Sequence, residues 1–126
     1  MKTILVDAWN VLFLEDGIFE EMHELLEKYP NRKIVLTNAN EEEQKKFGID
    51  KSPYEFFTLS HKPDKIDPVF YEKMLDNFNF KKEDVIYFEN DKGFAESARL
   101  VGIKTYHYNK DEKNLSKLKE FLDLNL

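Results

Sequence analysis

Polar side chains that could handle a phosphoryl group follow three apolar runs of this sequence. They are Asp7 after the first run, Thr37 and Asn38 at the end of the second, and Glu89, Asn90 and Asp91 after the third. A carboxylate can act as a nucleophile toward a phosphoryl group. Hydroxyl and amide groups can hold phosphate oxygens, a lysine can neutralise them, and further acidic groups can hold Mg²⁺. If the fold gathers these residues, phosphoryl chemistry becomes available to it.

The apolar runs belong to an alternation of strands and helices. The expected strands are Ile4–Asp7, Lys33–Thr37, Tyr54–Leu59, Val85–Phe88 and Ile103–Tyr108. The expected helices are Gly17–Tyr29, Glu41–Phe47, one that starts at Pro68 after Asp67, one from Phe94 to Val101, and a closing helix with Leu115, Leu118 and Leu122. Parallel strands need crossover connections, so this order predicts a three-layer, Rossmann-like α/β fold with a five-stranded parallel sheet and helices on both faces. The carboxyl ends of such strands open on one edge, where the polar residues should converge.

Composition limits the class of protein further. A chain of 126 residues has the length of one domain, which predicts a single domain over residues 1–126. The net charge is −6, with 19 Lys and Arg interspersed among 25 Asp and Glu, which argues against a nucleic-acid surface. No run reaches the roughly 20 apolar residues of a membrane span, and we expect no signal peptide, because Met1–Val6 is too short for one and is followed by a charged residue. Together with the absence of Cys, this predicts a cytoplasmic protein without membrane contact.

Four segments, in order along nearly the whole chain, resemble the signatures of the haloacid dehalogenase-like (HAD-like) hydrolase superfamily. They are Val6–Phe13, Ile34–Asn38, Lys65–Tyr71 and Val85–Asn90, the last followed by small residues up to Gly102. Lys62 also precedes Pro-Asp, but Lys65 keeps both the following Asp-Pro and the aromatic residue on the next turn. The resemblance implies the HAD-like fold. The stretches from Asp7 to Thr37 and from Thr37 to Lys65 leave no room for a cap domain, so we expect an open site.

The resemblance also implies catalytic and phosphate-binding roles. Asp7 would be the nucleophile. Thr37, with Asn38 beside it, would hydrogen-bond the phosphoryl oxygens, and Lys65 would balance the charge of nucleophile and phosphate.

A magnesium site is implied next to the nucleophile. Its ligands would be Asp7, the backbone carbonyl of Trp9, and the pair Glu89 and Asn90. Asp91 could replace Asn90 by a shift of one residue.

Two positions depart from the pattern of the family's phosphatases. Trp9 stands where they place an aspartate that protonates the leaving oxygen; positioned acid catalysis is worth about 10²- to 10⁴-fold, and an indole cannot supply it. Asn90 stands where a carboxylate contacts Mg²⁺, a hard cation that favours anionic oxygen. Trp9 also resembles the dehalogenase branch, but that branch has Gly-Thr where this chain has Asn10 and Val11.

Two hypotheses follow. The favoured one is a degenerate phosphohydrolase site with weak or lost catalysis and a binding role, in which a protein partner covers the open face. The alternative is an active capless Mg²⁺-dependent phosphohydrolase that acts on a phosphorylated substrate through Asp7. His61, in the loop before Lys65, could approach a ligand in either case. A receiver domain is excluded because the first strand is followed by a single Asp and an indole, and the third by Ser60 and His61.

Overall fold

The computed structural model describes residues 1–126 and contains one five-stranded parallel sheet. Its strands are β1 (Thr3–Asp7), β4 (Lys33–Thr37), β5 (Glu55–Thr58), β6 (Val85–Glu89) and β7 (Lys104–His107). Their spatial order is β5-β4-β1-β6-β7, and every neighbouring pair is parallel. The chain builds outward from β1 through β4 to β5 and then returns to the other side of β1. In open α/β sheets, ligands bind at the carboxyl ends of the strands beside such a reversal.

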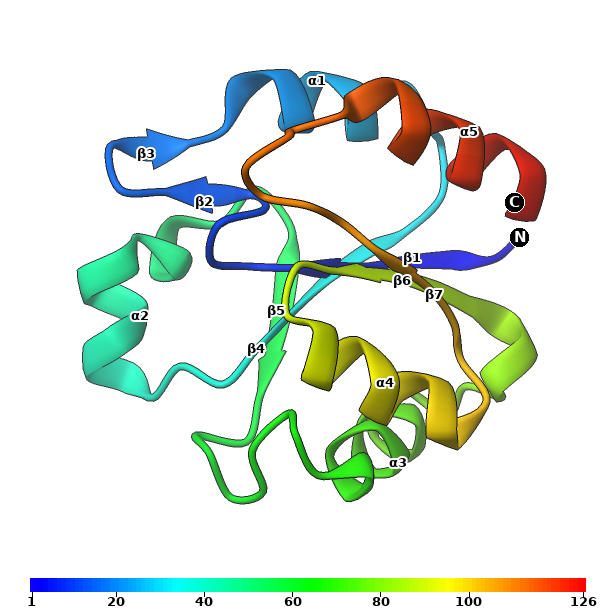
Figure 1. Cartoon of the computed structure of the whole chain (residues 1–126). Helices are drawn as coiled ribbons and strands as arrows, with labels where there is room; N and C mark the ends of the chain where they lie inside the picture. The colour runs from blue at the N-terminus through cyan, green and yellow to red at the C-terminus, as the bar shows by residue number, and fades with distance from the viewer.

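Helices cover both faces of this sheet (Figure 1). The helices α1 (Glu20–Glu27) and α5 (Leu115–Asn125) lie on one face, and α3 (Pro68–Phe78) and α4 (Lys92–Val101) lie on the other. The short helix α2 (Glu41–Phe47) and the hairpin of β2 (Phe13–Leu14) and β3 (Gly17–Ile18) stand beyond the carboxyl ends of the central strands. Two short 3₁₀ turns, Ile49–Lys51 and Lys82–Asp84, complete the elements. The predicted three-layer α/β fold without a cap domain is confirmed.

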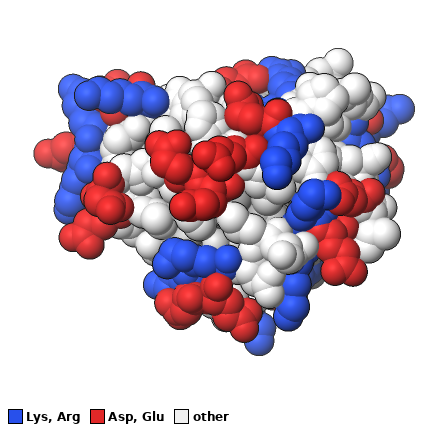
Figure 2. Space-filling model, turned by 90° about the horizontal axis from the view of Figure 1, so that it is seen from above, with Lys and Arg blue, Asp and Glu red and all other residues white.

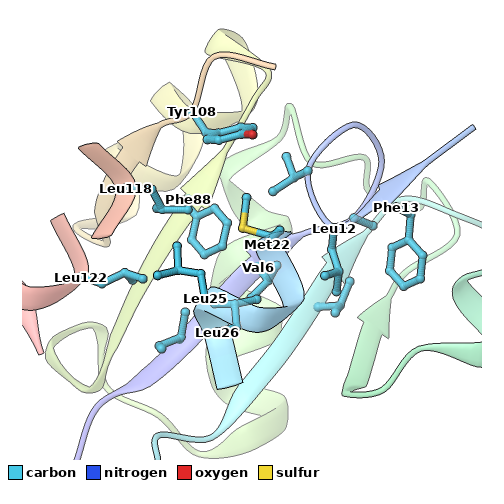
Figure 3. Packing of buried hydrophobic residues seen from close by; sticks show 14 of the residues in the cluster. Val6, Leu12, Phe13, Met22, Leu25, Leu26, Phe88, Tyr108, Leu118 and Leu122 are labelled. Atoms are coloured by element: carbon cyan, nitrogen blue, oxygen red, sulfur yellow. The ribbon is translucent and has the colours of Figure 1, made fainter. Parts of the chain in front are cut away.

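Side chains alternate between the two faces of each strand, so the sheet has a hydrophobic core on each of its faces. On β1, Ile4 and Val6 pack into the core beneath α1 and α5, whereas Leu5 packs into the core beneath α3 and α4. Figure 3 shows the first core, in which α1 and α5 side chains meet the sheet; it labels Met22, Leu25, Leu26, Leu118, Leu122, Val6 and Phe88. Successive strand side chains point to opposite faces, so Asp7 follows Leu5 toward α3 and α4.

One predicted element is wrong at its amino end. The expected helix Gly17–Tyr29 begins only at Glu20, because Gly17 and Ile18 form β3 and pair with β2 in an antiparallel hairpin. Gly17 has a φ of +125°, a conformation that other residues rarely adopt and that this turn requires. Ile18 stands at helical spacing from Met22, and it packs against the same core from a strand.

The predicted bounds of α2 and β4 agree with the structure. α2 begins with a capping box, in which the Asn40 side chain accepts from the Glu43 backbone and the Glu43 side chain accepts from the Asn40 backbone. It ends at Gly48, whose φ of +77° is the left-handed conformation of a helix C-cap.

The outer surface carries mixed charge. On the face formed by α1 and α5, acidic and basic side chains are interspersed without a continuous basic area (Figure 2). Every helix of the fold is too short or too polar to cross a bilayer.

Candidate functional site

Three charged side chains meet inside the protein at the carboxyl ends of β1 and β6. Lys65 Nζ lies 2.8 Å from Asp7 Oδ1 and 2.6 Å from Glu89 Oε1, and it also donates to the Leu36 carbonyl at 3.2 Å. The exposed fractions of the three side chains are 2, 7 and 1 %, respectively. Residues far apart in the sequence therefore converge on the sheet edge where the strand ends meet, with one ammonium between two carboxylates.

Burial and charge set the protonation of this triad. Burial by itself lowers the pKa of Lys65, but the carboxylates of Asp7 and Glu89 raise it above its ordinary value. Burial by itself raises the pKa of Asp7, but the Lys65 charge and hydrogen bonds bring it below its ordinary value. Burial and the nearby Asp7 charge raise the pKa of Glu89, against the effect of Lys65. Lys65 thus stays charged at neutral pH, while burial opposes the negative charge of both carboxyls.

The Asp7 carboxylate is surrounded by donors from its own chain. Oδ1 accepts from Lys65 Nζ at 2.8 Å and from the Ala8 backbone N–H at 2.9 Å. Oδ2 accepts from the Asn90 side chain at 3.0 Å and from the Asn90 backbone N–H at 3.3 Å. A carboxylate offers about four lone-pair positions, so all of those on Asp7 are in use.

Asn90 connects two oxygens that the resemblance assigns to a metal. Its Nδ2 donates to Asp7 Oδ2 at 3.0 Å and to the Trp9 backbone carbonyl at 3.2 Å. A divalent cation at this place would have to displace the amide.

The two other expected metal ligands are engaged elsewhere. Glu89 Oε1 contacts Lys65 and accepts from the Tyr87 hydroxyl at 2.5 Å, while Oε2 accepts from the Asp91 backbone N–H at 3.0 Å. Asp91 Oδ1 caps α4 by accepting from the Phe94 backbone N–H at 3.0 Å. Nowhere in the chain do three or more His, Asp or Glu side chains form a group that could hold a metal ion. The residues of this site, as they are arranged, do not fit Mg²⁺.

The indole of Trp9 forms an apolar wall beside the triad. Its ring centroid lies 4.5 Å from that of Phe47 at the end of α2, with the rings tilted by 38°. The next residue, Asn10, has a φ of +66° and carries the chain away from β1. The place of the expected acid is therefore held by a half-buried aromatic ring that has no proton to give at neutral pH.

Thr37 and Asn38 lie at the end of β4, on the rim of the same pocket. Thr37 Oγ1 accepts from the Ala39 backbone N–H at 3.1 Å, so the hydroxyl proton remains free for a ligand. Asn38 Oδ1 accepts from the Lys65 backbone N–H at 2.8 Å. Asn38 thus holds the loop that brings Lys65 to Asp7.

A second polar cluster ties α2 to that loop. His61 Nδ1 lies 3.0 Å from Asp64 Oδ2, and His61 Nε2 lies 2.9 Å from Glu43 Oε1. Hydrogen bonds to Asp64 and to Glu43 raise the pKa of His61 above its ordinary value. The sequence identified His61 as a residue near the site but gave no sign of its partner Glu43, which comes much earlier in the chain.

These groups line one cavity of about 310 Å³. Its polar floor is the triad with Asn90, and its apolar wall includes Trp9 and Phe47. The sequence reasoning missed Phe47, Phe94 and Lys110 among its lining residues. Lys110 could have been found, because it follows the last strand of the sheet and strand ends gather at this edge; the position of Phe47 depends on how α2 packs.

Sequence comparison does not assign the chain to a protein family. No protein-family model matches it, and no curated protein matches it.

Solved structures do match the fold. A HAD family enzyme from Bacteroides thetaiotaomicron, an aspartate-to-alanine mutant in complex with magnesium and inorganic phosphate, has a TM-score of 0.66 at 14% identity and covers 87% of this chain and 95% of its own. A protein assigned as a beta-phosphoglucomutase from Thermotoga maritima has a TM-score of 0.58 at 15% identity, over 85% of each chain. An uncharacterized protein from Corynebacterium glutamicum has a TM-score of 0.59 at 12% identity, over 98% of this chain and 96% of its own. At such identities the likeness concerns the fold alone.

Proposed function

Starting from a chain with the HAD-like hydrolase fold, we propose that its strand-end pocket serves to bind a partner molecule and that phosphoester hydrolysis is weak or lost. The observation that carries the proposal is the state of Asp7. All of its acceptor positions are used by donors of its own chain, from Lys65, Ala8 and Asn90. To attack phosphorus, the carboxylate would have to give up at least one of these bonds.

The leaving group also lacks a general acid that could protonate it. An acid at the Trp9 position would be worth about 10²- to 10⁴-fold, and the indole packed on Phe47 provides none. Mg²⁺ binds weakly at most, because the amide of Asn90 stands between two of its expected ligands. These two losses affect separate parts of the mechanism, acid catalysis and metal binding. Their combination favours a site that no longer depends on catalysis over a site adapted to a different leaving group.

The charges and polar groups of the pocket indicate which kind of ligand it would bind. The charge of Lys65 is already matched by Asp7 and Glu89, so the positive charge available to a ligand is that of Lys110, the lining lysine without an ion pair, which is too little for a dianion. The Thr37 hydroxyl can donate a hydrogen bond, and Trp9 offers an aromatic wall. We propose a ligand with a weakly charged polar group and an apolar part. A protein that covers the open edge, the partner expected from the sequence, would insert a group of this kind.

An active capless phosphohydrolase is the second candidate. One observation favours it: Asp7, Thr37 and Lys65 line the same cavity, with the Asp7–Lys65 pair intact at 2.8 Å. In that case the ligand is a phosphorylated substrate and Mg²⁺ is required.

Hydrolysis of 4-nitrophenyl phosphate separates the two candidates. Its leaving group needs little acid assistance, so the missing acid at Trp9 does not mask an intact nucleophile. The wild type and Asp7→Asn are compared with and without Mg²⁺, after circular dichroism has shown that both are folded. We expect the same background rate for both proteins. Mg²⁺-dependent turnover that lies far above the background rate and that Asp7→Asn abolishes would overturn the proposal in favour of the phosphohydrolase.

A further inference from the structure

We infer that the side-chain amide of Asn90 occupies the cation position of this pocket and makes it independent of divalent metals, so that the single substitution Asn90→Asp turns the pocket into a cation site. The inference concerns how the site is built. It rests on the proposed function, because the alternative phosphohydrolase would require Mg²⁺ in this pocket.

The contacts of one nitrogen atom carry the inference. Asn90 Nδ2 lies 3.0 Å from Asp7 Oδ2 and 3.2 Å from the Trp9 carbonyl oxygen, so each proton of the amide serves one oxygen. Mg²⁺ would need both oxygens at about 2.0–2.1 Å, with water completing an octahedron. The space between the oxygens is filled by a group that presents two positive dipole ends in place of an ion.

The amide is held in place by its surroundings. The Asn90 backbone N–H donates to Asp7 Oδ2 at 3.3 Å, and the Asn90 carbonyl oxygen lies 2.9 Å from His107 Nε2 at the end of β7. The following residue, Asp91, caps α4. The ends of β1, β6 and β7 and the start of α4 therefore position the Asn90 backbone, and a cation would have to displace the side-chain amide from the two oxygens that it contacts.

Charge compensation at Asp7 is complete without a metal. Lys65 supplies a full positive charge to Asp7 at 2.8 Å, and the amide supplies the dipole. Asn90→Asp would remove that dipole and add a carboxylate beside Asp7 and Glu89. Three carboxylates around one ammonium are stabilised when a cation binds among them.

Trp9 provides a signal for the test. It is the only tryptophan of the chain, and its own carbonyl is one of the two oxygens in question. Tb³⁺ is a hard cation that oxygen ligands bind, and its luminescence is sensitised by an indole close to it. Excitation of Trp9 therefore reports Tb³⁺ at this position.

The experiment compares the wild type, Asn90→Asp and the control Asn77→Asp, which adds the same charge at an exposed position of α3. Tb³⁺ luminescence and the melting temperature with and without Mg²⁺ are measured. We expect Asn90→Asp to bind Tb³⁺ roughly 10- to 100-fold more tightly than the wild type, because of the added anionic ligand, and to melt several degrees higher with Mg²⁺. The wild type and the control should show neither effect. Since no substrate is used, failure here is distinguishable from failure of the proposed function.

Two results would overturn the inference. One is a wild type that binds Tb³⁺ as tightly as Asn90→Asp does, and the other is a folded Asn90→Asp that binds neither cation. If Asn90→Asp folds only when Mg²⁺ is added, the inference is supported. If it does not fold at all, Asn90→Ala, which removes the amide without adding charge, should show a Mg²⁺-dependent rise in melting temperature that the wild type lacks; the absence of that rise would overturn the inference.

Discussion

Lys65 is the side chain that keeps two buried carboxylates compatible with folding. Replacing it with Met leaves Asp7 and Glu89 buried without a cation, and removal of one partner from a buried pair costs about 3–5 kcal/mol. We expect Lys65→Met to lower the free energy of unfolding at neutral pH by roughly that amount. Without the ammonium, burial raises the folded-state pKa of both carboxyls, so the stability of the variant should recover as the pH falls. Urea denaturation at several pH values measures this.

The exposed Lys62, three residues earlier, is the matched control. Lys62→Met should change the free energy of unfolding by no more than about 0.5 kcal/mol. If the two variants are equally stable, the triad does not contribute as described.

Two buried tyrosines give a contrasting pair at the same scale. The Tyr108 hydroxyl is buried without a hydrogen-bond partner, whereas the Tyr87 hydroxyl donates to Glu89 at 2.5 Å. An unsatisfied buried polar group costs about 1–3 kcal/mol. We therefore expect Tyr108→Phe to raise the melting temperature and Tyr87→Phe to lower it. Thermal melts followed by circular dichroism measure both melting temperatures. Equal shifts of the two variants would contradict the difference in hydrogen bonding between the two hydroxyls.

At the scale of the elements, the packing of α2 depends on charged hydrogen bonds that respond to pH. His61 links Glu43 of α2 to Asp64 of the loop before α3, and its pKa is raised in the folded state. A raised folded-state pKa gives stability that is fully present below the unfolded value of about 6.5 and is lost as the pH rises through the folded value. Glu43 and Asp64, whose pKa values are lowered, lose their share as the pH falls through those lowered values.

The substitution His61→Gln tests these hydrogen bonds. The contacts of His61 are partly exposed, so we expect a loss of at most about 1 kcal/mol, largest just below the unfolded pKa of about 6.5 and smaller as the pH rises through the raised folded-state pKa. Melting temperatures of the wild type and variant across this range provide the measurement. A difference that is the same at every pH would exclude charged hydrogen bonds at His61.

The elements also show what the sequence could and could not predict. The bounds of α2 follow from local chemistry, because Asn40 and Glu43 make a capping box and Gly48 can adopt the left-handed conformation. The hairpin strand β3 has only two residues, too few for strand alternation to outweigh the helical spacing of Ile18 and Met22. Short elements of this kind are fixed by packing and by their partner strand.

The candidate site was predictable to the same extent. Asp7, Thr37 and Glu89 line one cavity because strand ends gather at one edge of a parallel sheet, a rule that needs only the order of elements. Lys65 reaches this cavity from the loop between β5 and α3, and its role was implied only by the sequence resemblance. The hydrogen bonds from Asn90 to Asp7 and to the Trp9 carbonyl were not predictable. The sequence shows that asparagine is a weaker metal ligand than aspartate, but it does not show where the amide points. The His61–Glu43 contact depends on how two loops pack.

For the whole molecule, the fold that this chain shares with a HAD family enzyme is complete, whereas Trp9 and Asn90 stand where the sequence resemblance implies two residues of the family's phosphatase chemistry. If nothing else is missing, the double substitution Trp9→Asp with Asn90→Asp should produce Mg²⁺-dependent hydrolysis of an alkyl phosphate. Its rate should exceed that of Asn90→Asp alone by roughly 10²- to 10⁴-fold, the value of a positioned acid. Addition of Asp7→Asn to the double variant should abolish this turnover.

A folded double variant that binds Mg²⁺ and remains inactive would mean that the Thr37 and Lys65 geometry does not support phosphoryl transfer. The scaffold would then have diverged beyond the two positions.

The most direct measurement is a crystal structure of the wild type grown in millimolar Mn²⁺, whose anomalous scattering locates the ion without assumptions about the chain. We expect no anomalous peak beside Asp7, and we expect the Asn90 amide nitrogen within hydrogen-bond distance of both the Asp7 carboxylate and the Trp9 carbonyl. A peak between those two oxygens, with Asn90 turned away or bound to the ion through its own oxygen, would contradict it.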